Sequence, residues 1–64
     1  MAKILFAYGY NGTEVASHDV TGKTPAFELQ CRNDLTTTHN LTSEDHFFVV
    51  KDEEGNVLSK HEVE

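Results

Sequence analysis

The first regular alternation of larger and smaller side chains along this chain lies before Asn11. The larger side chains of this segment stand at every second position, Ile4, Phe6, Tyr8 and Tyr10. Because successive side chains of a strand point to opposite faces, this segment is predicted to be a strand with the larger set facing the core. Asn11-Gly12 follows it and favours a two-residue hairpin turn, since both residues accept a positive φ.

A second strand is predicted after this turn, with an irregularity in its pairing. If Asn11 and Gly12 are the two loop residues, Tyr8 lies opposite Val15. Val15 and Val20 have opposite parity, so a regular strand cannot bury both on one face. A β-bulge shifts the register by one residue and removes the conflict. We therefore expect a bulge near Ser17-His18.

The segment from Thr24 to Arg32 permits two interpretations. Phe27, Leu29 and Cys31 alternate with polar residues, which is the period of a strand and is the favoured interpretation. Thr24-Pro25, however, resembles a helix N-cap followed by proline at the first helical position. The sequence therefore predicts a third strand here, with a short helix within residues 24–45 as the alternative.

The last third of the chain predicts a second hairpin, with strands at residues 47–51 and 57–62. The loop between them contains Gly55, which is expected in the left-handed conformation. Phe47 and Phe48 are adjacent, so on a strand they point to opposite faces and both faces need cover. The predicted fold is all-β, a small five-stranded antiparallel sheet or partly closed barrel. It forms a single domain over residues 1–64, and the alternative is an α+β fold.

Charge is distributed unevenly along the 64 residues. The formal net charge is −6, and the part from residue 42 onward contributes −5 through seven acids and two lysines. Nucleic-acid binding needs several Lys or Arg side chains on one face, and five such residues scattered along the chain do not supply them. The acidic balance therefore predicts a protein partner with a basic surface, such as one that otherwise holds nucleic acid, and no direct binding of nucleic acid.

The cysteine content and the apolar runs predict a cytoplasmic protein. Cys31 is the single cysteine, so no disulfide forms within the chain, which fits a reducing compartment. No apolar run approaches the roughly 20 residues that span a bilayer, and the N-terminal run is too short for a secretion signal. Small, acidic proteins of this composition are common among virus-encoded inhibitors, so the cytoplasm of an infected host cell is one expected location.

The candidate chemical motifs all have ordinary structural explanations. The four histidines have no standard metal-ligand spacing, and one cysteine cannot build the common thiolate sites. Gly22-Lys23-Thr24 matches the last three residues of the phosphate-binding loop motif. That motif also needs a glycine at position 17, where this chain has a serine. Cys31 lies at one of the apolar positions of the alternating segment, and a free cysteine at such a position usually behaves as a small buried hydrophobic residue. We expect no catalytic residues, no metal and no cofactor, and the chain is not expected to be an enzyme.

The sequence thus predicts a small acidic protein-binding module, an inhibitor or regulator that docks its C-terminal hairpin on a basic surface. The residues expected to contact the partner are the acids of that region and two aromatic residues: Glu44, Asp45, Asp52, Glu53, Glu54, Glu62, Phe48 and Tyr10. The alternative is a small structural or accessory subunit that forms a homodimer through an open strand edge.

Overall fold

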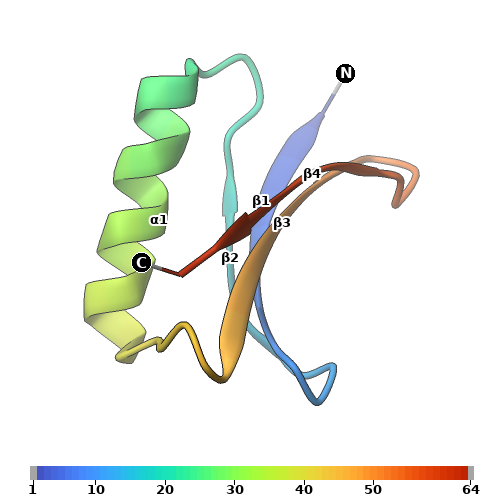
Figure 1. The fold of residues 1–64 in the computed structure, drawn as a ribbon. Helices are drawn as coiled ribbons and strands as arrows, with labels where there is room; N and C mark the ends of the chain where they lie inside the picture. The colour runs from blue at the N-terminus through green and yellow to red at the C-terminus, as the bar shows by residue number, and fades with distance from the viewer. Residues whose placement is uncertain (1, 64) are drawn as a thin grey trace.

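The computed structural model describes residues 2–63 as a four-stranded antiparallel sheet with one helix on one of its faces (Figure 1). The elements in chain order are β1 (Lys3–Gly9), β2 (Glu14–Asp19), α1 (Pro25–His39), β3 (His46–Asp52) and β4 (Val57–Glu62). The strands lie side by side in the order β2-β1-β3-β4. The expected β-rich sheet is present, but the fifth strand and the partly closed barrel are not found within the described residues.

The helix α1 occupies the segment for which a strand was the favoured prediction. Thr24 is the N-cap, and its hydroxyl oxygen accepts a hydrogen bond from the Phe27 amide at 3.2 Å. Pro25 follows as the first helical residue, where its fixed φ suits the helix and its missing N–H is not needed. Asn40 ends the helix in the left-handed conformation, and its amide donates to the Thr36 carbonyl oxygen. The favoured strand is therefore wrong for this segment, and the alternative, an α+β fold with a helix within residues 24–45, is confirmed.

The period-two pattern within α1 was misleading because the buried side of the helix is partly polar. Cys31 is buried and Phe27 is half-buried, whereas Leu29 is 44% exposed. Glu28 is also buried, and its carboxylate pairs with the Lys3 ammonium of β1 at 3.1 Å. A charged residue on the buried side of a short helix conceals the helical period from any count of apolar positions.

The order of the strands explains why a helix stands between β2 and β3. Both strands are antiparallel to β1, which lies between them, so they run parallel to each other. A parallel connection needs a long crossover, and a helix usually supplies it. The connection through α1 therefore covers one face of the sheet and leaves the opposite face without a helix, as Figure 1 shows.

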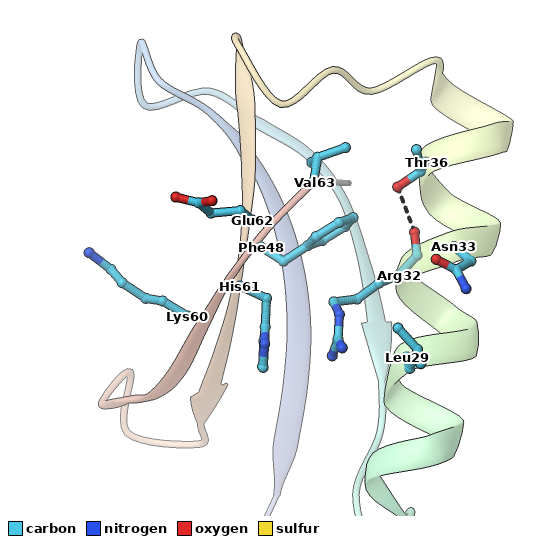
Figure 2. Close-up of a pocket in the computed structure, with 9 residues that line it drawn as sticks. All are labelled: Leu29, Arg32, Asn33, Thr36, Phe48, Lys60, His61, Glu62 and Val63. Atoms are coloured by element: carbon cyan, nitrogen blue, oxygen red, sulfur yellow. Dashed lines mark hydrogen bonds between the residues drawn. The ribbon is translucent and has the colours of Figure 1, made fainter.

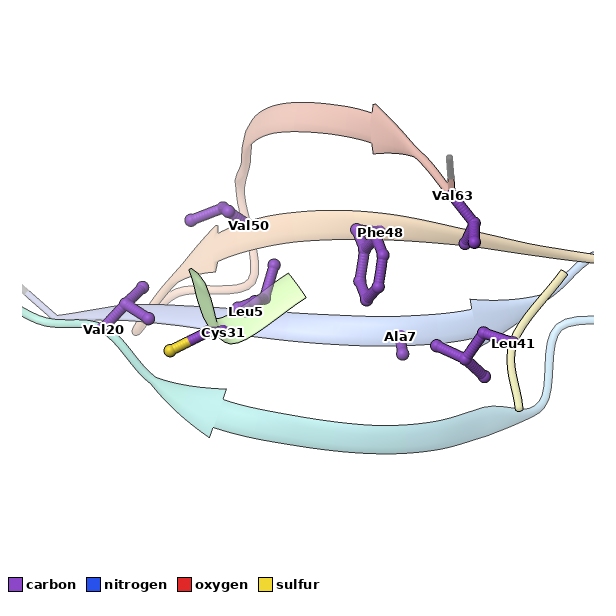
Figure 3. Close-up of a cluster of buried hydrophobic side chains, with 8 residues drawn as sticks. All are labelled: Leu5, Ala7, Val20, Cys31, Leu41, Phe48, Val50 and Val63. Atoms are coloured by element: carbon purple, nitrogen blue, oxygen red, sulfur yellow. The ribbon is translucent and has the colours of Figure 1, made fainter. Parts of the chain in front are cut away.

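The core lies between α1 and the sheet (Figure 3). It is formed by buried side chains from both central strands, the helix and the adjoining loops: Leu5, Ala7, Val20, Cys31, Leu41, Phe48, Val50 and Val63. The predicted alternation of β1 is present, but the faces are reversed. Leu5 and Ala7 face the helix, whereas Ile4, Phe6 and Tyr8 lie on the other face and are only half-buried.

The register of the first hairpin agrees with the predicted one except near the loop. Phe6 pairs with Ser17, but Tyr8 pairs with Glu14, so Val15 is the extra residue of a bulge. The bulge therefore lies nearer the turn than the expected Ser17-His18. It turns both Val15 and Ala16 towards the core, where they pack partly buried. Gly12 and Gly55 have φ values of 89° and 84°, which confirms the left-handed glycine predicted in each hairpin loop. The predicted two-residue turn at Asn11-Gly12 is wrong, because Asn11 does not have a positive φ and residues 10–13 separate β1 from β2.

Candidate functional site

The face of the sheet opposite α1, called the open face below, holds most of the aromatic side chains of the chain. Phe6 and Tyr8 come from β1 and Phe47 from β3, while Tyr10 comes from the loop after β1. These four residues form an aromatic row. The Phe6 and Tyr8 ring centroids are 5.6 Å apart, and Phe47 lies 5.9 Å from Tyr8 and 5.2 Å from Tyr10. Six of the 64 residues are aromatic, so this is a strong concentration on one surface.

Two lysines lie on the same face among the rings. The Lys51 ammonium is 5.5 Å from the Phe6 centroid and 4.9 Å from the Tyr8 centroid, and Lys60 is 6.0 Å from the Phe47 centroid. Such distances allow cation–π attraction. The Lys51 ammonium thus lies against both the Phe6 and the Tyr8 rings.

The aromatic row and the two lysines also bury an apolar residue on the open face, Val49. Val49 is only 3% exposed although it lies on the open face, where it pairs with Phe6 in β1 and Lys60 in β4. Its neighbours Phe48 and Val50 are buried on the helix side. The need for cover on both faces, inferred from residues 47–50, is thus met by α1 on one face. On the other face it is met by aromatic and lysine side chains.

Tyr10 is the most exposed member of the aromatic row, at 61% exposure. Its backbone is nevertheless held in place, because its amide donates to the Asp45 carbonyl oxygen at 2.9 Å. A hollow of about 540 Å³ lies beside it and is bordered by Phe47, Lys60 and Glu62 among others. Tyr10 was predicted to meet a partner, and the structure places it at the surface. Phe48, also in that predicted set, is 1% exposed in the core and does not reach the surface.

The acidic residues expected at the partner surface form two groups, not one. Glu44 and Asp45 precede β3, whereas Asp52, Glu53 and Glu54 stand at its other end. Six residue steps of a strand span roughly 20 Å. This is more than twice the screening length of about 8 Å at physiological ionic strength, so the two groups act as separate patches.

Asp52 belongs to the turn itself. One of its carboxylate oxygens accepts from the Glu54 and Asn56 amides, each at 2.9 Å, and the other accepts from the Asn56 side-chain amide at 3.2 Å. The backbone hydrogen bond from Asn56 is the largest of the contributions that lower the pKa of Asp52. Asp52 therefore shapes the hairpin loop with its side chain. Sequence analysis placed Asp52 in this loop but expected its carboxylate only to contact a partner, although Asp side chains commonly accept backbone hydrogen bonds in turns.

Other acids border the open face along its two edges. Residues paired directly across strands share a face, so Glu14 lies beside Tyr8, Asp19 beside Ile4 and Glu62 beside Phe47. Glu62 was predicted at the partner surface, while Glu14 and Asp19 were not. Asp19 lies opposite Ile4 in the same regular register that would place Tyr8 opposite Val15, whereas Glu14 reaches this face only because of the bulge at Val15.

Cys31 lies close to one of the four histidines, His18. The Cys31 sulfur lies 3.9 Å from His18 Nδ1, but that nitrogen is also 2.9 Å from the Asp19 carbonyl oxygen. Burial raises the pKa of the Cys31 thiol, with smaller contributions from Asp34 and Glu28, and this disfavours the thiolate. Among residues 2–63, no three His, Cys, Asp or Glu side chains converge as a metal site requires.

Within the described part of the chain, no helix has the length and apolar character needed to cross a membrane. The chain matches no protein-family model, no curated protein and no solved structure.

Proposed function

We propose that the chain is a small non-enzymatic protein-binding module whose open face docks on a protein with a basic surface. The observation that carries the proposal is the aromatic row on a face that α1 leaves uncovered, with Tyr10 61% exposed. Protein interfaces characteristically have an aromatic centre, enriched in Tyr and Phe, within a polar rim. The open face has this composition.

The charges around the aromatic row indicate the chemistry of the partner. Glu14 and Asp19 stand on the β2 edge, Glu62 stands on the β4 edge, and acidic groups lie at both ends of β3. A rim of this sign attracts a partner with Lys and Arg around an apolar centre, and it accelerates association at low salt. With a net charge of −6, the chain as a whole repels nucleic acid. If the partner uses this basic surface to bind its own ligand, docking of the chain would inhibit or regulate the partner.

The experiment uses a photo-crosslinking amino acid in place of Tyr10, with a second version at Thr38 on the exposed side of α1 as the matched control. A protein captured from lysate only through position 10 is identified, purified and titrated against the chain. Capture through both positions, or through neither, would mean that the open face is not a specific docking site.

Titration with the purified partner then separates the aromatic row from the rim. Tyr10→Ala should weaken binding at least about tenfold, as removal of a central interface aromatic does. Glu14→Lys should mainly slow association and reduce its salt dependence. Asp34→Lys is the matched control, because it makes the same charge change on the exposed side of α1. Equal effects of the two lysine variants would show that total charge, not the rim of the open face, attracts the partner.

A further inference from the structure

The edge strand β4 has a hollow on each of its two faces. On the helix side, a groove of about 560 Å³ lies between β4 and α1, with Phe48, Val63 and Arg32 among its lining residues (Figure 2). On the open face, the hollow of about 540 Å³ lies beside Tyr10 and Phe47. Residues 60–62 border both hollows. Residues 60–62 are therefore uncovered on both faces, and no strand of the described residues pairs with the outer edge of β4.

The two edges of the sheet differ in what a second strand would meet. β2 carries Glu14 and Asp19 and contains no lysine or arginine, so pairing with its own copy offers no opposite charges. It also contains the bulge at Val15. β4 carries Lys60 and Glu62, one on either side of His61 and both on the same face. A strand that holds both signs at this spacing is complementary to itself when a copy runs antiparallel to it.

We propose that two copies of the chain associate by antiparallel pairing of their β4 strands, with His61 opposite His61 of the second copy at the two-fold axis. In this register Lys60 lies opposite Glu62 of the second copy, and the symmetry repeats the pair. The two sheets become one continuous eight-stranded sheet. A two-fold contact of this kind uses the same surface patch on both copies.

The irregularity of β4 agrees with this register. Val50 pairs with Ser59 but Lys51 pairs with Val57, so Leu58 is an extra residue that interrupts the strand. The regular part of β4 after this extra residue, 59–62, contains Lys60, His61 and Glu62, so the proposed register uses only regular strand positions. Moving the two-fold axis to residue 60 or 62 would place lysine opposite lysine or glutamate opposite glutamate, which is destabilising. Charge therefore selects the register centred on His61.

The surroundings of His61 permit two imidazoles to meet at the axis. Its Nε2 lies 3.2 Å from the Ser59 hydroxyl oxygen, and Phe48 is its partner on β3. From α1, Arg32 and Glu28 act on it with opposite signs. Burial is the main cause that lowers the pKa of His61, and Arg32 adds to it. The imidazole is therefore neutral at pH 7, so the axis does not bring two positive charges together.

Sedimentation velocity over a concentration series that reaches the millimolar range tests the pairing. The unmodified chain should show a reversible monomer–dimer equilibrium. Lys60→Glu should weaken the dimer about tenfold or more, because it turns both opposite-charge pairs into like-charge pairs. Lys23→Glu is the matched control, with the same charge change in the loop before α1. A chain that stays monomeric throughout, or a Lys60→Glu variant that dimerises like the unmodified chain, would overturn the proposal.

Two charge exchanges test the register itself. The double variant K60E/E62K restores both pairs and should recover dimerisation. A mixture of the Lys60→Glu and Glu62→Lys single variants should form a heterodimer, although each alone stays monomeric. Circular dichroism of every variant confirms that the fold is retained. If the folded double variant remains monomeric and the mixture forms no heterodimer, Lys60 and Glu62 do not meet across the axis and the register is wrong.

Discussion

Lys51 donates a hydrogen bond from Nζ to the hydroxyl oxygen of Tyr8 at 3.0 Å, joining the two central strands across the open face. The two residues are 43 positions apart in the chain. The bond fixes the Tyr8 ring next to Phe6 and Phe47. A surface whose aromatic side chains are already ordered loses less side-chain entropy when it binds, so this contact favours the docking proposed for the open face.

Removal of the Tyr8 hydroxyl should destabilise the fold. Tyr8→Phe leaves the ring in place but removes the acceptor for Lys51, and this should cost about 0.5–1.5 kcal/mol. Tyr10→Phe is the control, because the described residues provide no hydrogen-bond partner for its hydroxyl. Urea denaturation measures both free energies of unfolding. Equal losses for the two variants would show that the Lys51 hydrogen bond contributes nothing to stability.

The two adjacent phenylalanines should differ sharply in their effect on stability. Phe48 is 1% exposed in the core, so Phe48→Ala should cost about 3–5 kcal/mol and abolish cooperative unfolding in a chain of this size. Phe47 is half-buried on the open face, so Phe47→Ala should leave a cooperative transition. Thermal denaturation followed by circular dichroism separates them. A folded Phe48→Ala variant would contradict the observed core.

Gly55 should resist substitution for conformational reasons alone. Its φ is 84°, and a Cβ added there would meet no atom within 4 Å. Gly55→Ala should therefore cost about 1–2 kcal/mol through the left-handed backbone and not through a clash. Glu54→Ala, one residue earlier in the same exposed loop, should have little effect. If both variants melt at the same temperature, the loop conformation differs from the one described.

Stability should fall as the solution becomes more acidic through the range in which His61 titrates. The folded pKa of His61 is lowered below the ordinary value of 6.5, so the unfolded chain binds the proton more readily. The folding stability that is linked to the neutral His61 imidazole is therefore fully present above pH 6.5, and it is lost as the pH falls towards the folded pKa of His61. Urea denaturation along this pH range measures it. The pH dependence should flatten in His61→Gln, and an unchanged slope would assign the effect to another group.

The sequence predicted the surface position of only some of the residues expected to contact a partner. Tyr10 precedes the Asn-Gly turn and is therefore near an exposed loop, although the alternation of β1 alone had predicted it on the core face. Phe48 could not be told from Phe47, because adjacent strand residues point to opposite faces and nothing local says which face is covered. The sequence shows that acidic residues are concentrated from residue 42 onward. Their division into two groups, one at each end of β3, depends on where that strand begins and ends.

Several local features of this protein follow from short-range signals in its sequence. Gly12 and Gly55 specify turns through their access to positive φ, and the alternating segments specify strands through the two-sided geometry of the backbone. Thr24-Pro25 specified a helix start, although the neighbouring apolar spacing concealed it. These signals act within a few residues, so they are present in the sequence.

The tertiary structure decided which face became the core and which remained open. Packing of α1 against Leu5, Ala7 and Phe48 buried the smaller set of β1 and left Phe6 and Tyr8 outside. It also made β4 an edge strand, which set Lys60 and Glu62 at a free border of the sheet. Strand order and the choice of covered face come from contacts between residues distant in the chain. The alternation of a single strand is the same whichever face is buried, so it contains no information about that choice.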